Sequence, residues 1–184
     1  YRVALVPQPD WHGDYRDFKK LGRPRLFFSI SPGAMDSMVN RYTANRRLRS
    51  DDAYTPGGRH GMRPDYPSIV YTKILKQLYP DVPVVLGGIE ASLRRLTHYD
   101  YWQDSLRRCI LCDSGADLIV YGMGERPIVE ICRQLEGGTP FDQLRSIPQT
   151  VYLCREGDIP GGVGDDDIVL HSHEECLHNK KAAA

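Results

Sequence analysis

Hydrophobic residues along this 184-residue chain fall into short runs that alternate with longer stretches of helical spacing. The runs are typical of β-strands. They occupy residues 3–6, 25–30, 82–86, 117–121, 150–153 and 168–170. The stretches with helical spacing occupy residues 14–21, 34–42, 67–78 and 126–136. In the third of these, Val70, Tyr71, Ile74, Leu75 and Leu78 share one face, as in a helix that covers a core.

Strands that alternate with helices predict a mostly parallel sheet covered on both faces. We therefore expect an α/β fold with three layers, an open, doubly wound sheet similar to that of flavodoxin, as one domain over residues 1–184. The chain begins directly in a predicted strand without an initiator methionine, and it ends in three alanines without a helix cap. We expect both ends to be cuts in a larger protein, with the first strand and helix of the fold outside this chain.

Two segments have neither the hydrophobic spacing of a strand nor that of a helix. Residues 41–65 are rich in Arg, Asp, Gly and Pro, and they are predicted to form a loop insertion, since long irregular insertions are usually functional lids or disordered. Residues 155–184 are predicted to be a trailing segment that leads toward the rest of the protein.

Composition indicates the cellular location and the partners to expect. Lys and Arg number 24 and Asp and Glu number 24, so no global field draws the chain to nucleic acid or to an anionic membrane. No apolar stretch approaches the roughly 20 residues that cross a bilayer, and no signal peptide opens the chain. The five cysteines are odd in number and scattered, which suits reduced thiols. These features predict a cytoplasmic protein without a membrane partner.

Glycine- and serine-rich turns follow three of the predicted strands. Ligands of open α/β sheets bind at the carboxyl ends of the strands, so these turns and the polar residues after them predict a pocket. The candidate pocket residues are Ser29, Ser31, Gly33, Asp36, Asn40, Gly87, Gly88, Glu90, Ser92, Arg94, Arg95, His98, Gly122, Gly124 and Glu125. The alternative is that tight strand-to-helix turns need glycine in any case. Nucleotide binding has little support, because Gly122 and Gly124 lack the third glycine of a dinucleotide fingerprint and no Walker motif is present.

Residues 90–102 combine carboxylates, two guanidinium groups, an imidazole and three large aromatic rings. Arginine can hold a phosphate or carboxylate with two hydrogen bonds, and the aromatic rings can stack on bases or pack against another domain. The alternative is a buried network of ion pairs that ties loops to the sheet.

One stretch is both basic and aromatic. Its members are Arg41, Arg46, Arg47, Arg49, Arg59 and Arg63, with Tyr42 and Tyr54 between them. Such a pattern is typical of a surface for single-stranded nucleic acid. Asp51, Asp52 and Asp65 dilute the charge, so a solvated or self-paired loop is the alternative.

Potential metal ligands are few. Cys109 and Cys112 have the spacing of a metal-binding pair, but no second pair follows, and their apolar surroundings favour a buried element. A zinc site could be built from residues near the carboxyl end, which are instead interpreted as exposed residues at a helix start. They are His171, His173, Cys176 and His178. No Ser/His/Asp set or pair of catalytic carboxylates stands out.

Several strings together resemble one family. They are MDSMVNRYTA (35–44), LRSDDAYTPG (48–57), VVLGGIEASLRR (84–95), HYDYW (98–102) and YGMGERP (121–127). Across residues 1–181 the chain is similar to the amino-terminal region of YgiQ-type radical SAM proteins. The resemblance implies a larger enzyme with a four-iron four-sulfur cluster and S-adenosylmethionine, which the cluster reduces to a 5′-deoxyadenosyl radical.

That chemistry needs three thiolates in a Cys-x3-Cys-x2-Cys loop, which this chain lacks. The resemblance places that loop downstream, so we expect no cofactor, metal ligand or catalytic residue here. The domain also resembles the cobalamin-binding modules of other radical SAM proteins. Tyr15 stands where their Asp-x-His-x-x-Gly pattern after Asp10 and His12 needs glycine, so cobalamin binding is not the favoured interpretation.

The resemblance implies an accessory domain of a radical SAM enzyme of unknown substrate, inactive by itself. It would help to position substrate or would cap the catalytic barrel, and its first partner would be the radical SAM core of the same protein. The alternative is a module that binds RNA or recruits a partner through residues 41–63. The substrate would be RNA or a small molecule.

Overall fold

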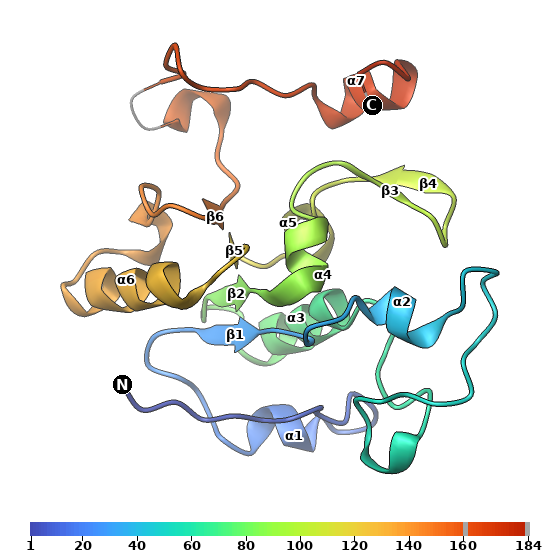
Figure 1. Ribbon diagram of the computed structural model, residues 1–184. Coiled ribbons are helices and arrows are strands. Elements are labelled where there is room, and N and C mark those ends of the chain that lie inside the picture. The colour runs from blue at the N-terminus through green and yellow to red at the C-terminus, as the bar shows by residue number, and fades with distance from the viewer. Residues whose placement is uncertain (160–161, 183–184) are drawn as a thin grey trace.

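The computed structural model describes residues 1–159 and 162–182, and it contains an open four-stranded sheet (Figure 1). In spatial order the strands are β1 (Phe28–Ile30), β2 (Val84–Leu86), β5 (Leu118–Val120) and β6 (Thr150–Val151). The first three run parallel, and β6 runs antiparallel to β5. The predicted α/β class with an open, mostly parallel sheet is confirmed.

Helices cover both faces of this sheet. On one face, Val84, Leu86 and Ile119 pack in a core with side chains of α1 (Arg16–Lys19), α3 (Pro67–Leu78) and α5 (Ile110–Ser114). On the other face, Val85, Leu118 and Val120 pack against Ile131 of α6 (Glu125–Glu136). Because β2 and β5 are buried on both faces, their sequences are continuous runs of Val, Ile and Leu.

Several elements lie outside the predicted pattern. After β2 the chain forms α4 (Gly88–Leu93) and then an antiparallel hairpin of β3 (His98–Asp100) and β4 (Ser105–Arg107). The remaining helices are α2 (Ser37–Arg41), α7 (His173–His178) and the short 3₁₀ turns η1 (Pro56–Gly58), η2 (Phe141–Gln143) and η3 (Glu156–Asp158). No helix within the described ranges is long and apolar enough to cross a membrane.

Two predicted strands are wrong. Residues 3–6 and 168–170 form no strand, and their apolar side chains are exposed, with Val3 at 89% and Ile168 at 86%. A strand needs a neighbour to satisfy its backbone hydrogen bonds, and neither segment lies beside one. Apolar β-branched residues alone were therefore insufficient to predict a strand there.

Candidate functional site

The carboxyl ends of β1, β2 and β5 bring three turns together at one edge of the sheet. The amide of Gly87 donates to the carbonyl of Ile30 at 2.8 Å. The hydroxyl of Ser92 donates to the Gly88 carbonyl at 2.8 Å and accepts from the Gly122 amide at 3.4 Å. Ser92 thus connects the turn after β2 to the turn after β5. We call the turns 31–33, 87–92 and 122–124 the carboxyl-edge turns.

Gly88 is the tightest point of these turns. Its φ angle is +77°, and a Cβ atom added there would lie 2.7 Å from Ser31 Oγ and 3.3 Å from the Gly33 carbonyl oxygen. Both the backbone conformation and the close approach of the first turn therefore require glycine at this position. The requirement concerns packing between turns and does not by itself indicate a ligand.

Replacing Gly88 with alanine is expected to lower the free energy of unfolding by roughly 2–4 kcal/mol, from the strained φ angle and from overpacking together. Gly138 is a matched control, because its φ angle is +89° and nothing lies within 4 Å of an added Cβ. Gly138→Ala is expected to cost about 1 kcal/mol, from backbone strain alone. Urea denaturation measures both variants, and equal losses would show that the contact with Ser31 and Gly33 is unimportant.

Asp36 and Arg94 form a buried ion pair behind the carboxyl-edge turns. The two side chains are 6% and 8% exposed, and Arg94 Nη2 lies 3.2 Å from Asp36 Oδ1. Asp36 also caps α2, because its carboxylate accepts from the amides of Met38 and Val39. Burial acts to lower the pKa of Arg94, but the hydrogen bond and charge of Asp36 raise it above its ordinary value. This arrangement favours a structural role for Arg94.

Glu90 is fully buried between α4 and α3. Its Oε1 accepts a hydrogen bond of 3.0 Å from the amide of Ser68, in the first turn of α3. A carboxylate suits that position, because the first amides of a helix have no partner within the helix. The other carboxylate oxygen, Oε2, has no hydrogen-bond partner among the described residues.

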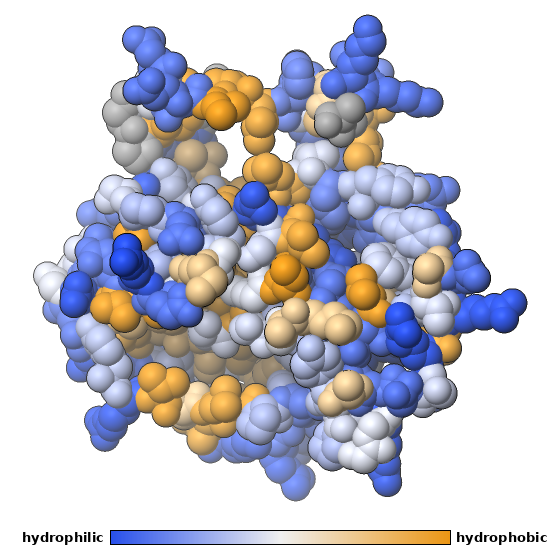
Figure 2. All heavy atoms as spheres, in the orientation of Figure 1, coloured by the Kyte–Doolittle hydropathy of each residue, from blue (hydrophilic) through white to orange (hydrophobic). Residues whose placement is uncertain are grey.

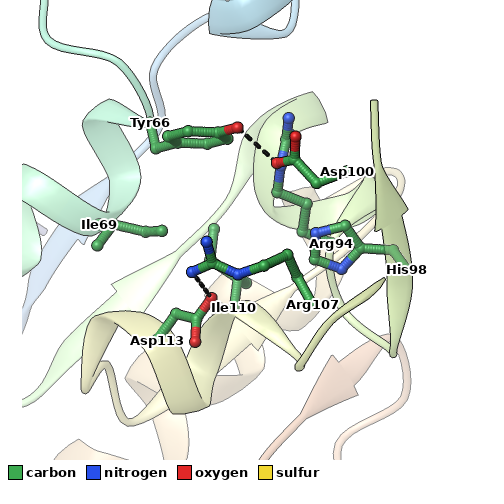
Figure 3. Close-up of a pocket in the computed structure, with 8 residues that line it drawn as sticks. All are labelled: Tyr66, Ile69, Arg94, His98, Asp100, Arg107, Ile110 and Asp113. Carbon is green, nitrogen blue, oxygen red and sulfur yellow. Dashed lines mark hydrogen bonds and ion pairs between the residues drawn. The ribbon is translucent and has the colours of Figure 1, made fainter. Parts of the chain in front are cut away.

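A small cavity lies between α3, α4, α5 and the β3–β4 hairpin (Figure 3). Its volume of about 20 Å³ holds one water molecule and excludes a substrate. Its lining residues are Tyr66, Ile69, Arg94, His98, Asp100, Arg107, Ile110 and Asp113. Figure 3 shows the hydroxyl of Tyr66 directed at Asp100, and Arg107 donates to Asp113 at 2.6 Å.

The surroundings of this cavity lower the pKa values of both Asp100 and His98. Burial acts to raise the pKa of Asp100, but hydrogen bonds from Tyr66 and from the Gln103 amide lower it overall. Burial and the charge of Arg94 lower the pKa of His98, against the opposing hydrogen bond with the Leu96 carbonyl. Burial and the bond to Asp100 raise the pKa of Tyr66 well above its ordinary value. The hydrogen bond between Tyr66, which precedes α3, and Asp100 of β3 holds the hairpin to α3. The sequence analysis did not identify Tyr66 as a site residue.

Asp52 connects two parts of the insertion at residues 41–65 with each other and with α2. Its Oδ1 accepts from Asn40 Nδ2 at 2.7 Å, and its Oδ2 accepts from Arg63 Nε at 3.2 Å. Arg63 also donates to the Pro32 carbonyl at 3.1 Å, in the turn after β1. Asn40 and Arg63 therefore serve contacts within the domain.

The other predicted pocket residues occupy different surroundings. Ser29 and Glu125 are exposed, and Gly124 packs near Val120. Arg95 donates to the Ser92 carbonyl at 2.6 Å, and its guanidinium lies 4.9 Å from the centre of the Tyr121 ring. The predicted pocket residues thus meet as neighbouring turns and buried pairs rather than as the lining of one large cavity. Their binding of a ligand stays a prediction.

A resident metal cluster does not fit the described residues. No group of three or more His, Cys, Asp or Glu side chains among them could hold a metal ion. The five cysteines are free thiols, of which Cys109 is half-buried and Cys176 is buried. No chemical step through a cluster is therefore assigned to the residues that the structure describes.

Comparison with known proteins identifies the family. A family model described as "Radical SAM N-terminal" matches residues 1–184. A UPF0313 protein of Bacteroides thetaiotaomicron is 62% identical over 194 residues, which cover 100% of this chain and 31% of the relative. A UPF0313 protein of Porphyromonas gingivalis is 66% identical over 183 residues, which cover 100% of this chain and 29% of the relative.

The YgiQ protein of Salmonella typhimurium, also a UPF0313 protein, is 47% identical over 196 residues, with 100% of this chain and 27% of the relative covered. No solved structure matches. The chain spans less than a third of the length of these curated relatives. Because the family model covers every residue and the relatives are this similar, the chain belongs to the Radical SAM N-terminal family.

Proposed function

We propose that this chain is an accessory domain of a radical SAM enzyme and that α4 docks against the catalytic part of the same protein. The proposal rests mainly on one observation, which is that α4 and the residues after it expose their large apolar side chains, whereas only the small Ala91 of α4 packs in the core. Ile89, Leu93 and Leu96 are exposed by 38%, 59% and 46%. On the inward side, Glu90 and Arg94 are buried. The usual orientation of a surface helix is the reverse.

Ile89 and Leu93 share one side of α4 because a spacing of four residues places them on the same helical face. Leu96 follows in the turn after α4 and is exposed as well. Met123, 73% exposed, adds to them, since Ser92 connects its turn to α4. Hydrophobic side chains also gather in the middle of the face drawn in Figure 2, where Figure 1 shows α4. We call Ile89, Leu93, Leu96 and Met123 the α4 surface. A contiguous exposed apolar patch of this kind is typical of an interaction site.

The occupant we propose is the rest of the protein. This chain covers only 31% and 29% of two close relatives, so proteins of this family carry a large additional part. The last described helix, α7, lies on the same side, because His173 Nδ1 is 3.3 Å from Thr97 Oγ1 and Glu174 pairs with Arg108 at 3.1 Å. A part of the protein that follows α7 would therefore be tethered near Leu96.

Such docking would serve radical chemistry by closing the catalytic part against water, since a reactive intermediate must be protected from side reactions. The cluster and S-adenosylmethionine would be held by the catalytic part. The residues of this chain would contribute apolar contact through the α4 surface and a rigid support through the buried pair of Asp36 and Arg94.

Leu93→Asp in the full-length protein is expected to open this interface. A buried leucine contributes about 1.5–3 kcal/mol, so amide exchange in residues 88–96 should speed up on the order of tenfold or more. Hydrogen–deuterium exchange with mass spectrometry measures the change.

Leu21→Asp is the matched control, because Leu21 is 54% exposed near the end of α1, away from α4, and its replacement should leave exchange in residues 88–96 unchanged. Equal exchange in the two variants would contradict the proposed docking surface.

A further inference from the structure

A second surface lies where the loop after α2 meets the β3–β4 hairpin. The hydroxyl of Tyr101 donates to the carbonyl of Ala44 at 2.8 Å, although 57 positions separate them in the chain. The guanidinium of Arg46 lies 4.5 Å from the centre of the Tyr101 ring, the distance of a cation–π contact. Figure 1 shows the turn between β3 and β4 approaching this loop. The two segments therefore present their side chains on one surface.

The loop itself has a defined backbone. Tyr42 and Leu48 form an antiparallel bridge, and the Thr43 amide donates to the Arg47 carbonyl at 2.8 Å. The Arg46 amide donates to the Thr43 carbonyl at 2.9 Å, and Arg46 has a φ angle of 58°. Left-handed backbone is uncommon for arginine, and here the hydrogen-bonded turn imposes it. The arginine side chains thus project from a tight turn.

The six arginines of the basic stretch divide into two groups by their charge partners. Arg41 and Arg63 pair with Asp65 and Asp52 inside the insertion. The other four are Arg46, Arg47, Arg49 and Arg59, which are exposed and form no ion pair with any acidic side chain of the described residues. Three of the four lie on or beside the loop tip. Their charge is therefore available to an anionic partner.

Exposed aromatic rings are found on the hairpin that Arg46 contacts. Tyr99 and Tyr101 are 57% and 44% exposed. The Tyr99 hydroxyl donates to Asp104, and the Tyr101 ring lies edge-on to the Trp102 ring with 5.6 Å between the ring centres. The contact with Asp104 thus orients the Tyr99 ring, and the contact with Trp102 orients the Tyr101 ring. We call Arg46, Arg47, Arg49, Tyr99 and Tyr101 the Arg–Tyr patch.

We propose that the Arg–Tyr patch binds single-stranded nucleic acid. Proteins that bind single strands combine arginines that contact phosphates with aromatic side chains that stack on bases, and this patch supplies both within one surface. The chain has no net charge, so the binding would come from this local group alone. The proposal is independent of the α4 surface, which is apolar and formed by other residues.

The test uses full-length protein that contains this chain, with fluorescein-labelled 12-nucleotide oligouridylate and oligothymidylate as probes. Fluorescence anisotropy gives the Kd at several salt concentrations. Arg46→Ala/Arg47→Ala is expected to raise the Kd about tenfold or more and to reduce the salt slope by about 1.4, since each phosphate contact with a single strand contributes about 0.7. Tyr99→Ala is expected to raise the Kd about fivefold or more through lost stacking.

Two controls separate this proposal from general effects. Arg16→Ala/Arg126→Ala removes two exposed arginines on α1 and α6 and should leave the Kd unchanged. Arg46→Lys/Arg47→Lys keeps the charge and should keep the salt slope. Equal binding of the two probes, or tighter binding of the ribose strand through its 2′-hydroxyls, supports the proposal. Absence of salt-dependent binding, or equal losses in the patch variant and the Arg16/Arg126 variant, overturns it.

Discussion

Replacing Asp36 with alanine is expected to lower the free energy of unfolding by about 3–5 kcal/mol, because the buried guanidinium of Arg94 would lose the carboxylate that is hydrogen-bonded to it. Arg94 is 7% exposed, so its guanidinium is largely shielded from bulk solvent. The substitution also removes the cap of α2, which contributes about 1 kcal/mol. Urea denaturation followed by circular dichroism measures the loss.

Two further variants separate the charge from the cap. Asparagine caps a helix as well as aspartate does, so Asp36→Asn should keep the cap and still show most of the loss. Asp36→Asn/Arg94→Met removes both charges, and it should recover much of the stability, since buried ion pairs can often be replaced by uncharged groups. A single Asp36→Asn variant as stable as the parent chain would show that the ion pair contributes little.

The buried position of Arg94 distinguishes between the two interpretations of residues 90–102. For Arg94 the geometry favours the network of ion pairs, because its charge is matched by Asp36 inside the domain. Arg95 differs, since it contacts a carbonyl and an aromatic ring and forms no ion pair among the described residues. A ligand role at the carboxyl-edge turns therefore rests on Arg95 and the turns rather than on Arg94.

The sequence predicted the central strands from short apolar runs bounded by turn residues, and the long helices from their helical spacing. The strands β2 and β5 are continuous apolar runs, and α3 and α6 each have 12 residues, enough to show a helical face. Helix α4 was not predicted because it has 6 residues and buries Glu90 while exposing Ile89 and Leu93. Sequence patterns are interpreted by placing charged residues at the surface, which for this helix would wrongly predict that the side with Ile89 and Leu93 faces the core.

The site was predictable only as far as topology determines it. Parallel strands end on one edge, so the meeting of the turns near Ile30, Gly87 and Gly122 follows from the order of strands. The hydrogen bonds of Asn40 with Asp52 and of Tyr66 with Asp100 could not be predicted. Each joins two segments far apart in the chain, and no hydrophobic pattern in the sequence indicates that these segments meet. The alternative stated for the basic stretch was a solvated or self-paired loop, and the contacts of Asp52 with Asn40 and Arg63 agree with self-pairing.

Asp52 provides the sharpest test of that insertion. Asp52→Asn is nearly isosteric, yet it leaves Arg63, whose side chain is 9% exposed, without a negative partner. The expected loss is about 3–5 kcal/mol in the free energy of unfolding. The neighbouring Asp51 is the control, since it is exposed and forms no ion pair among the described residues, and Asp51→Asn should stay within about 0.5 kcal/mol of the parent chain.

The difference between the Asp52→Asn variant and the parent chain should also depend on pH. Burial acts to raise the pKa of Asp52, but hydrogen bonds from Asn40 and the Tyr54 amide, with the charge of Arg63, lower it overall. A carboxylate whose pKa is lower in the folded state stabilises fully above its unfolded value of about 3.9, and that contribution disappears as the pH falls through the folded value. Denaturation at neutral pH should therefore separate the two proteins, whereas below the folded pKa of Asp52 they should converge. A difference in the free energy of unfolding that stays constant down to that pH would mean that Asp52 acts through its shape and not through its charge. The ion pair with Arg63 would then not be the contact that stabilises the insertion.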